Sequence, residues 1–281
     1  MGARSVGRVT AVAAVAVGSI VGWLGFTPTA SPAPQWAAAS TASIRPGSVM
    51  VTDGAQCTAN FVFTRGIEVF LGYAAHCAGT GGATETNGCN AGSLPLGTPV
   101  QIRGASRPGV LVYSSWLAMQ QVRERNADAC EHNDFALVRI DSRDARLVNP
   151  TVPHWGGPVG LNRTGNPNGA AVFSYGSSSL RQGIALLSPK AGSSSGTTAG
   201  GWAHPVYTIT PGIFGDSGSA LLDAAGRATG VLSTVNITPM PLSNTFGDLQ
   251  HMLAYARVHG MGNTVVANGT GPFNPNQLPL G

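Results

Sequence analysis

Gly215-Asp216-Ser217-Gly218-Ser219 is the stretch of this 281-residue chain that says most about its fold. A serine between two glycines predicts a tight turn, and the glycines leave room for a ligand to approach the backbone. Two earlier stretches, Asn133-Asp134-Phe135-Ala136 and Ala74-Ala75-His76-Cys77, add a carboxylate and an imidazole. These three groups together make a serine hydroxyl attack a carbonyl carbon.

Each of the three residues has an expected role in that chemistry. Ser217 is the candidate nucleophile, and the N–H groups of Gly215 and Ser217 are candidate donors to an oxyanion. His76 is the candidate general base. Asp134 begins an apolar run, so we expect it to be partly buried with the imidazole N–H as its partner. The simpler alternatives are an ordinary Gly-Ser turn, a structural histidine and a strand-capping aspartate.

Along the chain the histidine stretch comes first, the aspartate stretch second and the serine stretch third. With this order, the three stretches resemble those of the chymotrypsin-fold serine peptidases, in particular the short secreted members from actinobacteria. The resemblance covers residues 44–260 and implies an all-β fold of two antiparallel six-stranded β-barrels with a C-terminal helix. The composition agrees with many short strands and tight turns, since the chain has 39 glycines, 19 prolines and only 10% charged residues.

Short apolar runs bounded by turn-forming residues predict the strands. The N-terminal barrel is expected in residues 48–155 and the C-terminal barrel with its helix in residues 156–260. The expected strands are Ser48–Thr52, Gln56–Thr64, Glu68–Tyr73, Pro99–Ile102, Gly109–Trp116, Phe135–Ile140, Ala171–Tyr175, Ile184–Leu187, His204–Thr210, Ser219–Leu222, Thr229–Thr234 and one near Ile237. Helices are expected at Trp116–Arg125 and from Phe246 to Ala256, the latter capped by Asn244 or Thr245, and an exposed loop at Ala191–Gly201.

The first residues have the pattern of an export signal. Arg4 and Arg8 precede an uncharged, mostly apolar stretch, 9–26, and cleavage is expected after Ala30 or Ala39. An uncleaved membrane anchor is the alternative, because about 18 residues are on the border of what spans a bilayer. Residues 31–47 are then a spacer or short propeptide, residues 261–281 a tail, and the protein is expected to be a monomer secreted from the cell or associated with its envelope.

Charge and cysteine content bound the partners and cofactors. The formal net charge is +4 and the basic residues are scattered, so we expect no nucleic-acid partner. Four cysteines in an exported chain favour two disulfides, and without a CxxC pair we expect no metal; the chemistry requires no other cofactor. The sequence permits three pairings, and the resemblance implies Cys57–Cys77, which leaves Cys89–Cys130.

The resemblance also assigns a specificity pocket. Its base is expected at Pro211, six residues before the serine, and its wall at Ser233, Thr234 and Val235. Val235 stands where enzymes specific for large residues have glycine, which favours a small or medium apolar residue on the acyl side of the cut. Leu232 stands where glutamate-specific relatives have histidine.

Asp216 needs a partner. In animal relatives it pairs with a newly cut N-terminus, but Ser43-Ile44-Arg45-Pro46 is a poor match to such a terminus, and an internal cation such as Arg181 is the alternative.

We therefore expect a secreted serine endopeptidase that cleaves proteins or peptides through an acyl-enzyme. The alternatives are an exported binding protein on the same scaffold and an esterase with the same triad. An α/β-hydrolase is disfavoured, because its acid and histidine follow the serine, which here leaves only a pair such as Asp248 and His251. The other histidines weighed as bases are His132, His154, His204 and His259.

Overall fold

The computed structural model describes residues 1–3, 34–82, 85–236 and 242–279. The chain divides into two units, Met1–Ser31 and Pro32–Gly281, and the second contains all the strands and helices of the described residues. Residues 4–33, which hold most of the export signal expected at the N-terminus, lie outside the described residues. Within the described part of the chain, no helix combines the length and the apolar character that crossing a membrane requires.

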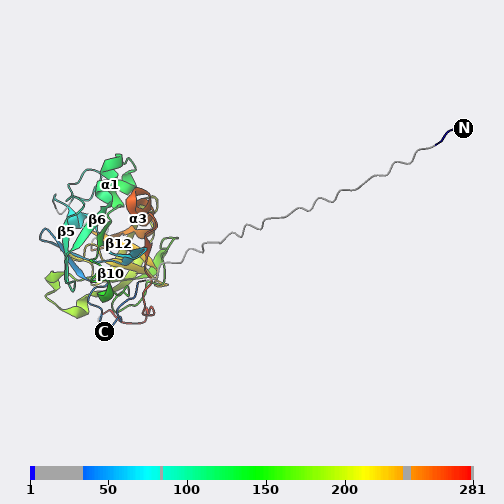
Figure 1. Cartoon of the computed structure of the whole chain (residues 1–281). Coiled ribbons are helices and arrows are strands. Elements are labelled where there is room, and N and C mark those ends of the chain that lie inside the picture. The colour runs from blue at the N-terminus through cyan, green and yellow to red at the C-terminus, as the bar shows by residue number, and fades with distance from the viewer. Residues whose placement is uncertain (4–33, 83–84, 237–241, 280–281) are drawn as a thin grey trace. The chain divides into compact units, whose positions relative to one another are not determined.

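The first half of the second unit forms an eight-stranded antiparallel sheet (Figure 1). The order across it is β14-β3-β4-β7-β6-β5-β1-β2, so seven strands come from the first half of the fold and one from the end of the chain. Two short helices, α1 (Ser115–Val122) and α2 (Ala127–His132), lie between β6 and β7. The strands are β1 (Val49–Thr52), β2 (Ala55–Thr58), β3 (Val62–Arg65), β4 (Glu68–Tyr73), β5 (Pro99–Ile102), β6 (Gly109–Ser114), β7 (Ala136–Arg139) and β14 (Val265–Val266).

The second half forms a closed six-stranded antiparallel barrel with the order β10-β13-β12-β11-β8-β9. Its strands are β8 (Asn168–Tyr175), β9 (Pro189–Ser195), β10 (Ala203–Ile209), β11 (Ala220–Asp223), β12 (Ala228–Val235) and β13 (Asn244–Asp248). The barrel is closed by pairing of β9 with both β8 and β10, which leaves no free edge.

Two groups of buried apolar side chains hold the fold together. A small cluster of five side chains, one from each barrel strand except β9, contains Val172, Val206, Leu221, Leu232 and Phe246. A larger cluster lies under the eight-stranded sheet and extends to the helix α3 (Leu249–Ala256), whose Leu249, Met252, Leu253 and Ala256 are all buried. The helical spacing of these four residues is what makes α3 amphipathic.

The all-β fold class, with a six-stranded barrel and a C-terminal helix, is confirmed. The N-terminal part differs in having eight strands in one sheet, partly because the expected strand Gln56–Thr64 is two strands, β2 and β3. Residues 59–61 separate them, and there the side-chain Oδ1 of Asn60 accepts the Phe61 N–H at 2.7 Å. Local side-chain bonding of this kind competes with a continuous strand.

Other expected elements in the second barrel were wrong. Ile184–Leu187 is not a strand but includes the 3-10 turn η4 (Ala185–Leu187), and Ile184 and Leu186 are exposed. Much of the loop expected at 191–201 is instead strand β9, although its sequence Pro-Lys-Ala-Gly-Ser-Ser-Ser contains no large apolar residue. Pairing with two neighbours, rather than local propensity, makes this segment a strand. The strand expected near Ile237 lies outside the described residues.

The helix near the end begins later than expected. Asn244 and Thr245 belong to β13, and the cap of α3 is Asp248, whose carboxylate accepts the His251 N–H at 2.8 Å. The earlier apolar position, Phe246, faces the barrel interior from β13.

The described residues that follow α3 pack against the rest of the fold. Val265 and Val266 pair with β3, opposite Thr64 and Phe63. Further on, the Phe273 ring lies 5.3 Å from the Phe173 ring of β8. The segment expected to be a tail therefore contacts both sheets.

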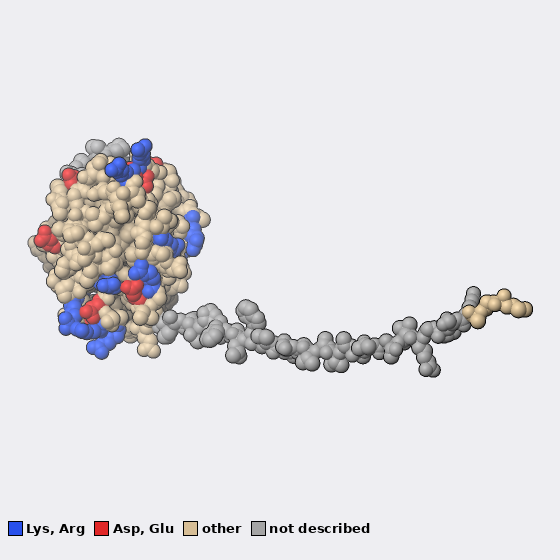
Figure 2. Space-filling model, turned by 45° about the horizontal axis from the view of Figure 1, so that its top comes forward, with Lys and Arg blue, Asp and Glu red and all other residues tan. Residues whose placement is uncertain are grey.

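Charged residues are sparse on the surface. Figure 2 shows basic and acidic side chains in small separate groups on a largely uncharged face.

Candidate active site

The imidazole of His76 and the carboxylate of Asp134 form a hydrogen-bonded pair. His76 lies in the 3-10 turn η1 (Ala75–Ala78) after β4, and Asp134 lies between α2 and β7. His76 Nδ1 is 2.6 Å from Asp134 Oδ2, and the His76 backbone N–H donates to Oδ1 at 2.8 Å. The Ser233 hydroxyl also donates to Oδ2, at 2.6 Å. Asp134 is 2% exposed, so these three hydrogen bonds compensate the burial of its charge.

This pairing changes the proton affinity of both residues. Burial acts to raise the pKa of Asp134, but the charge of His76 and the three hydrogen bonds lower that pKa below its ordinary 3.8. Burial acts to lower the pKa of His76, but the charge and hydrogen bond of Asp134 outweigh it and raise that pKa above 6.5. An ionised Asp134 keeps the proton of neutral His76 on Nδ1 and leaves Nε2 free to accept another.

Disulfides hold the segments that carry both residues. Cys57 of β2 is bonded to Cys77, the residue after His76. Cys89 is bonded to Cys130 of α2, four residues before Asp134. Cys57–Cys77 is the pairing that the resemblance implied, and Cys89–Cys130 is the one that it left.

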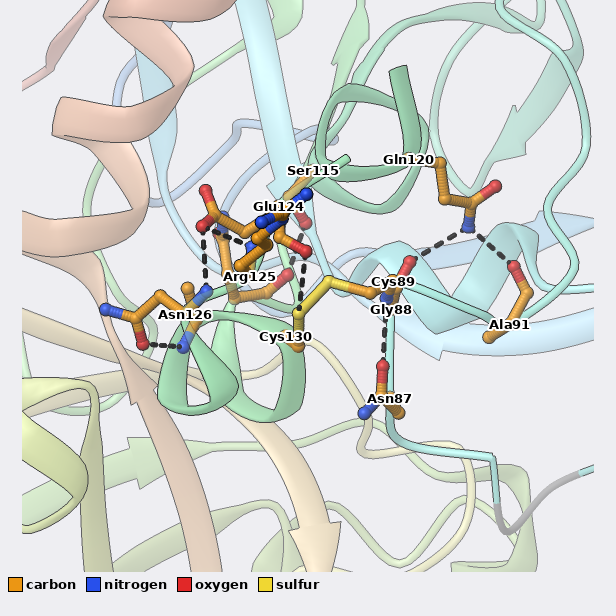
Figure 3. The surroundings of a disulfide bond; sticks show 12 residues. Asn87, Gly88, Cys89, Ala91, Ser115, Gln120, Glu124, Arg125, Asn126 and Cys130 are labelled. Atoms are coloured by element: carbon orange, nitrogen blue, oxygen red, sulfur yellow. Dashed lines mark hydrogen bonds between the residues drawn. A yellow bond between two sulfur atoms is a disulfide. The ribbon is translucent and has the colours of Figure 1, made fainter. Parts of the chain in front are cut away.

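Figure 3 shows how the Cys89–Cys130 disulfide is reinforced. The Gln120 amide of α1 donates to the carbonyls of Gly88 and Ala91, at 2.9 and 2.7 Å, and the Gly88 N–H donates to the Cys130 carbonyl at 2.8 Å. The loop after η1 is thereby fastened to both helices that precede Asp134.

Ser217 lies on the turn that precedes β11. Gly215 and Gly218 have φ values of +90° and +87°, in the region that strongly favours glycine. A Cβ on Gly218 would lie 2.6 Å from the Thr58 carbonyl oxygen, so only glycine fits against that strand. The Ser217 carbonyl accepts the Thr58 N–H at 2.8 Å, which joins this turn to the N-terminal sheet.

The N–H groups of Gly215 and Ser217 make no hydrogen bond within the described part of the chain, and both residues line one cavity. Two unpaired backbone donors on one tight turn are the arrangement that binds an oxyanion. The Ser217 hydroxyl likewise has no hydrogen bond to any described residue.

The cavity brings the expected residues together from both halves of the fold. It has a volume of about 520 Å³ and is lined by His76, Asp134 and Ser217. On the N-terminal side its wall also includes Glu85, Thr86 and Trp116, which the sequence did not suggest. The hydroxyl and the imidazole face the same space without a hydrogen bond between them, and such contacts often tighten only when substrate is bound.

Asp216, beside the nucleophile, is fully buried and forms ion pairs with two cations. Arg181 Nη2 lies 2.5 Å and Lys190 Nζ 3.2 Å from Asp216 Oδ2. Burial lowers the pKa of Lys190 to about 8, Asp216 acts against this, and Arg181 adds to it. Arg181 was expected from the sequence; Lys190 was not, although it is the only lysine of the chain.

The expected specificity residues are only partly brought together. Ser233, Thr234 and Val235 line the cavity, and Val235 is 42% exposed. Pro211 is not among the lining residues; its carbonyl accepts from Arg181 at 3.0 Å.

Asn244, which the sequence suggested only as a helix cap, holds the backbone at Gly212, the residue after Pro211. Asn244, 1% exposed, accepts the Gly212 N–H at 2.7 Å and donates to the Gly212 carbonyl at 3.2 Å. It also lies directly opposite Val235 in the β12–β13 pairing. A β-strand asparagine carries no distinctive signal in a single sequence, because its partner is defined only by the strand register.

The alternative acid and histidine lie elsewhere. Asp248 accepts hydrogen bonds from His204 Nε2 and His251 Nδ1, at 2.8 and 2.7 Å, at the start of α3. Neither Asp248 nor any histidine other than His76 lines the cavity that contains Ser217. The only described group of three potential metal ligands is Cys57, His76 and Cys77, and its two sulfurs are joined in the disulfide.

Comparison with solved structures identifies the fold. Thermobifida fusca Protease A is similar with a TM-score of 0.51 and 18% sequence identity, over 80% of this chain and 99% of that one. A glutamic acid-specific serine protease that uses a histidine triad in substrate binding is similar with a TM-score of 0.50 and 17% identity, over 80% and 100%. Cellulomonas bogoriensis chymotrypsin follows with a TM-score of 0.47 and 18% identity, over 80% and 98%. No protein-family model matches the chain, and no curated protein matches it at a significant level.

Proposed function

This chain has the fold of the bacterial chymotrypsin-like serine proteases, and we propose that it is a serine endopeptidase that acts outside the cell. The observation that carries this proposal is the hydrogen-bonded pair of buried Asp134 and half-buried His76, which lines the same cavity as Ser217. The two disulfides support an oxidising, extracellular location.

The mechanism uses groups of this chain alone. Ser217 Oγ attacks the peptide carbonyl while His76 Nε2 takes its proton, and Asp134 stabilises the resulting imidazolium. The N–H groups of Gly215 and Ser217 stabilise the oxyanion of the tetrahedral intermediate. His76 then gives its proton to the leaving amine, and water, deprotonated by His76, releases the acyl group from Ser217.

We infer a preference for a small or medium apolar residue on the acyl side of the cut. Val235 lines the cavity that contains Ser217, at the position expected for the wall of the specificity pocket. A large side chain would have to pass the Val235 side chain. In a peptide-library assay, Val235→Gly should shift preference toward Phe and Leu. Preference of the unaltered enzyme for Arg, Lys or Glu would contradict the proposed specificity.

Activity without a newly cut N-terminus is part of the proposal. Asp216, which needs a cation, has Arg181 and Lys190 as partners, so no free amine is required to hold the turn.

The decisive experiment is labelling of the oxidised protein with a fluorophosphonate and mapping of the adduct by mass spectrometry. We expect the adduct on Ser217, its loss in His76→Ala, and a fall in peptide turnover on the order of 10⁶ in Ser217→Ala. Peptide turnover equal in wild type and Ser217→Ala would refute the assignment. Absence of labelling would favour a binding protein, and turnover of esters alone would favour an esterase.

A further inference from the structure

Each candidate oxyanion donor is the N–H of a peptide group whose carbonyl accepts a hydrogen bond from a serine hydroxyl. The Phe214 carbonyl accepts from Ser178 Oγ at 2.5 Å. The peptide bond from Phe214 to Gly215 is trans, so its N–H points away from its carbonyl. Fixing the Phe214 carbonyl on Ser178 therefore fixes the direction of the Gly215 N–H, which has no hydrogen-bond partner within the described chain.

The second donor is held in the same way. The Asp216 carbonyl accepts from Ser219 Oγ at 2.5 Å and from the Ser219 N–H at 3.0 Å. Its peptide bond is also trans, so the Ser217 N–H points to the opposite side.

Both serines are held in place themselves. Ser178 is 5% exposed, and its backbone N–H donates to Asp216 Oδ1 at 2.9 Å. Its hydroxyl oxygen also accepts the Leu180 N–H at 3.2 Å, which leaves the hydroxyl proton for Phe214. Ser219 is fully buried. Because Gly215 is a glycine with positive φ, the Phe214–Gly215 peptide plane can rotate at little steric cost, and the Ser178 hydroxyl opposes that rotation.

Resting on the proposed function, we propose that Ser178 and Ser219 are positioning residues that orient the two oxyanion-hole peptide planes. Neither serine lines the cavity that contains Ser217. Each acts through the carbonyl of the peptide whose N–H binds the oxyanion, so its effect appears in the transition state and not in substrate binding.

The test compares Ser178→Ala with Ser177→Ala. The Ser177 hydroxyl is adjacent in sequence, but donates to the Gly47 carbonyl at 2.7 Å and does not touch the turn. For Ser178→Ala we expect kcat to fall on the order of 10- to 100-fold with KM within about twofold. A misdirected N–H still stabilises the oxyanion in part, so the loss is smaller than for complete removal of a donor. A peptide aldehyde, which forms an oxyanion on Ser217, should lose affinity by the same factor, whereas Ser177→Ala should match wild type in both measurements.

Two further variants separate positioning from folding. Ser178→Thr keeps the hydroxyl and should recover most of kcat. Ser219→Ala should give the same kcat-specific loss, provided its thermal midpoint and fluorophosphonate site match wild type. Wild-type kcat and aldehyde affinity in Ser178→Ala would overturn this inference while the proposed function stands. A wild-type protein that labels nowhere would overturn the proposed function, and the oxyanion role with it.

Discussion

At the scale of single residues, the site depends on charges that are buried and compensated. Asp134 accepts three hydrogen bonds, and Asp216 forms ion pairs with two cations. The partners of both carboxylates are distant in sequence. The pKa shifts that follow from these contacts can be measured.

The first prediction concerns the pH dependence of turnover. The base must be neutral, and the Asp134 carboxylate raises the pKa of His76 above 6.5. The acidic limb of kcat/KM should therefore have its midpoint above pH 6.5. Asp134→Asn should lower kcat on the order of 10⁴-fold at neutral pH, since it removes the group that selects the tautomer. A midpoint below 6.5 in the wild type would contradict the Asp134–His76 pairing.

The second prediction concerns Lys190. Because burial lowers its pKa to about 8, the folded protein releases this proton at lower pH than the unfolded chain does. The unfolded state then binds more protons at this residue between about pH 8 and pH 10, so the contribution of Lys190 to the free energy of unfolding should rise with pH through this window. In urea titrations, the stability of the wild type relative to Lys190→Met should therefore increase from about pH 8 to pH 10. Parallel pH profiles for the two proteins would mean that folding does not lower the pKa of Lys190.

At the scale of elements, the two helices before Asp134 are both fastened to the loop after η1. Helices of eight and six residues are too short to be stable alone, so tertiary contacts must maintain them. The Cys89–Cys130 disulfide and the Gln120 hydrogen bonds supply those contacts (Figure 3).

The third prediction follows from this tie. The double variant Cys89→Ser, Cys130→Ser should lose about 4 kcal/mol of unfolding free energy, as expected for a bridge that encloses a loop of 41 residues. It should also lower kcat/KM, because α2 leads directly to Asp134. Gln120→Ala serves as a control that keeps the disulfide and should lose about 1 kcal/mol. Unchanged stability and activity in the double variant would mean that the helices need no such tie.

At the scale of the whole molecule, the C-terminal segment joins parts that are distant in sequence. It adds a strand to the N-terminal sheet and an aromatic ring to the barrel side, against Phe173. A Cβ on Gly226 would lie 2.4 Å from the Phe273 ring, which shows how closely that ring packs.

The fourth prediction tests this junction. Phe273→Ala should lower the unfolding free energy by about 2 kcal/mol, less than for a fully buried phenylalanine because this ring is half-buried. Fluorophosphonate labelling of the folded variant should be unchanged, since Phe273 does not line the cavity. Chemical denaturation gives the first quantity, and a stability equal to wild type would show that the segment contributes little.

The sequence by itself determined the class of fold and the three residues of the candidate triad. Strand-length apolar runs have a period that identifies them locally, and Ala-Ala-His-Cys, Asn-Asp-Phe-Ala and Gly-Asp-Ser-Gly-Ser are recognisable without knowing what they contact. Tertiary structure alone decided that the apolar-poor segment Pro189–Ser195 is a strand, because the barrel needs a partner between β8 and β10. It also decided that Lys190 joins Arg181 on Asp216, that Asn244 holds the Gly212 backbone, and that Ser178 holds the Phe214 carbonyl. These contacts join residues 26 to 36 positions apart, and a contact across such a separation leaves no periodic signal in the chain that forms it.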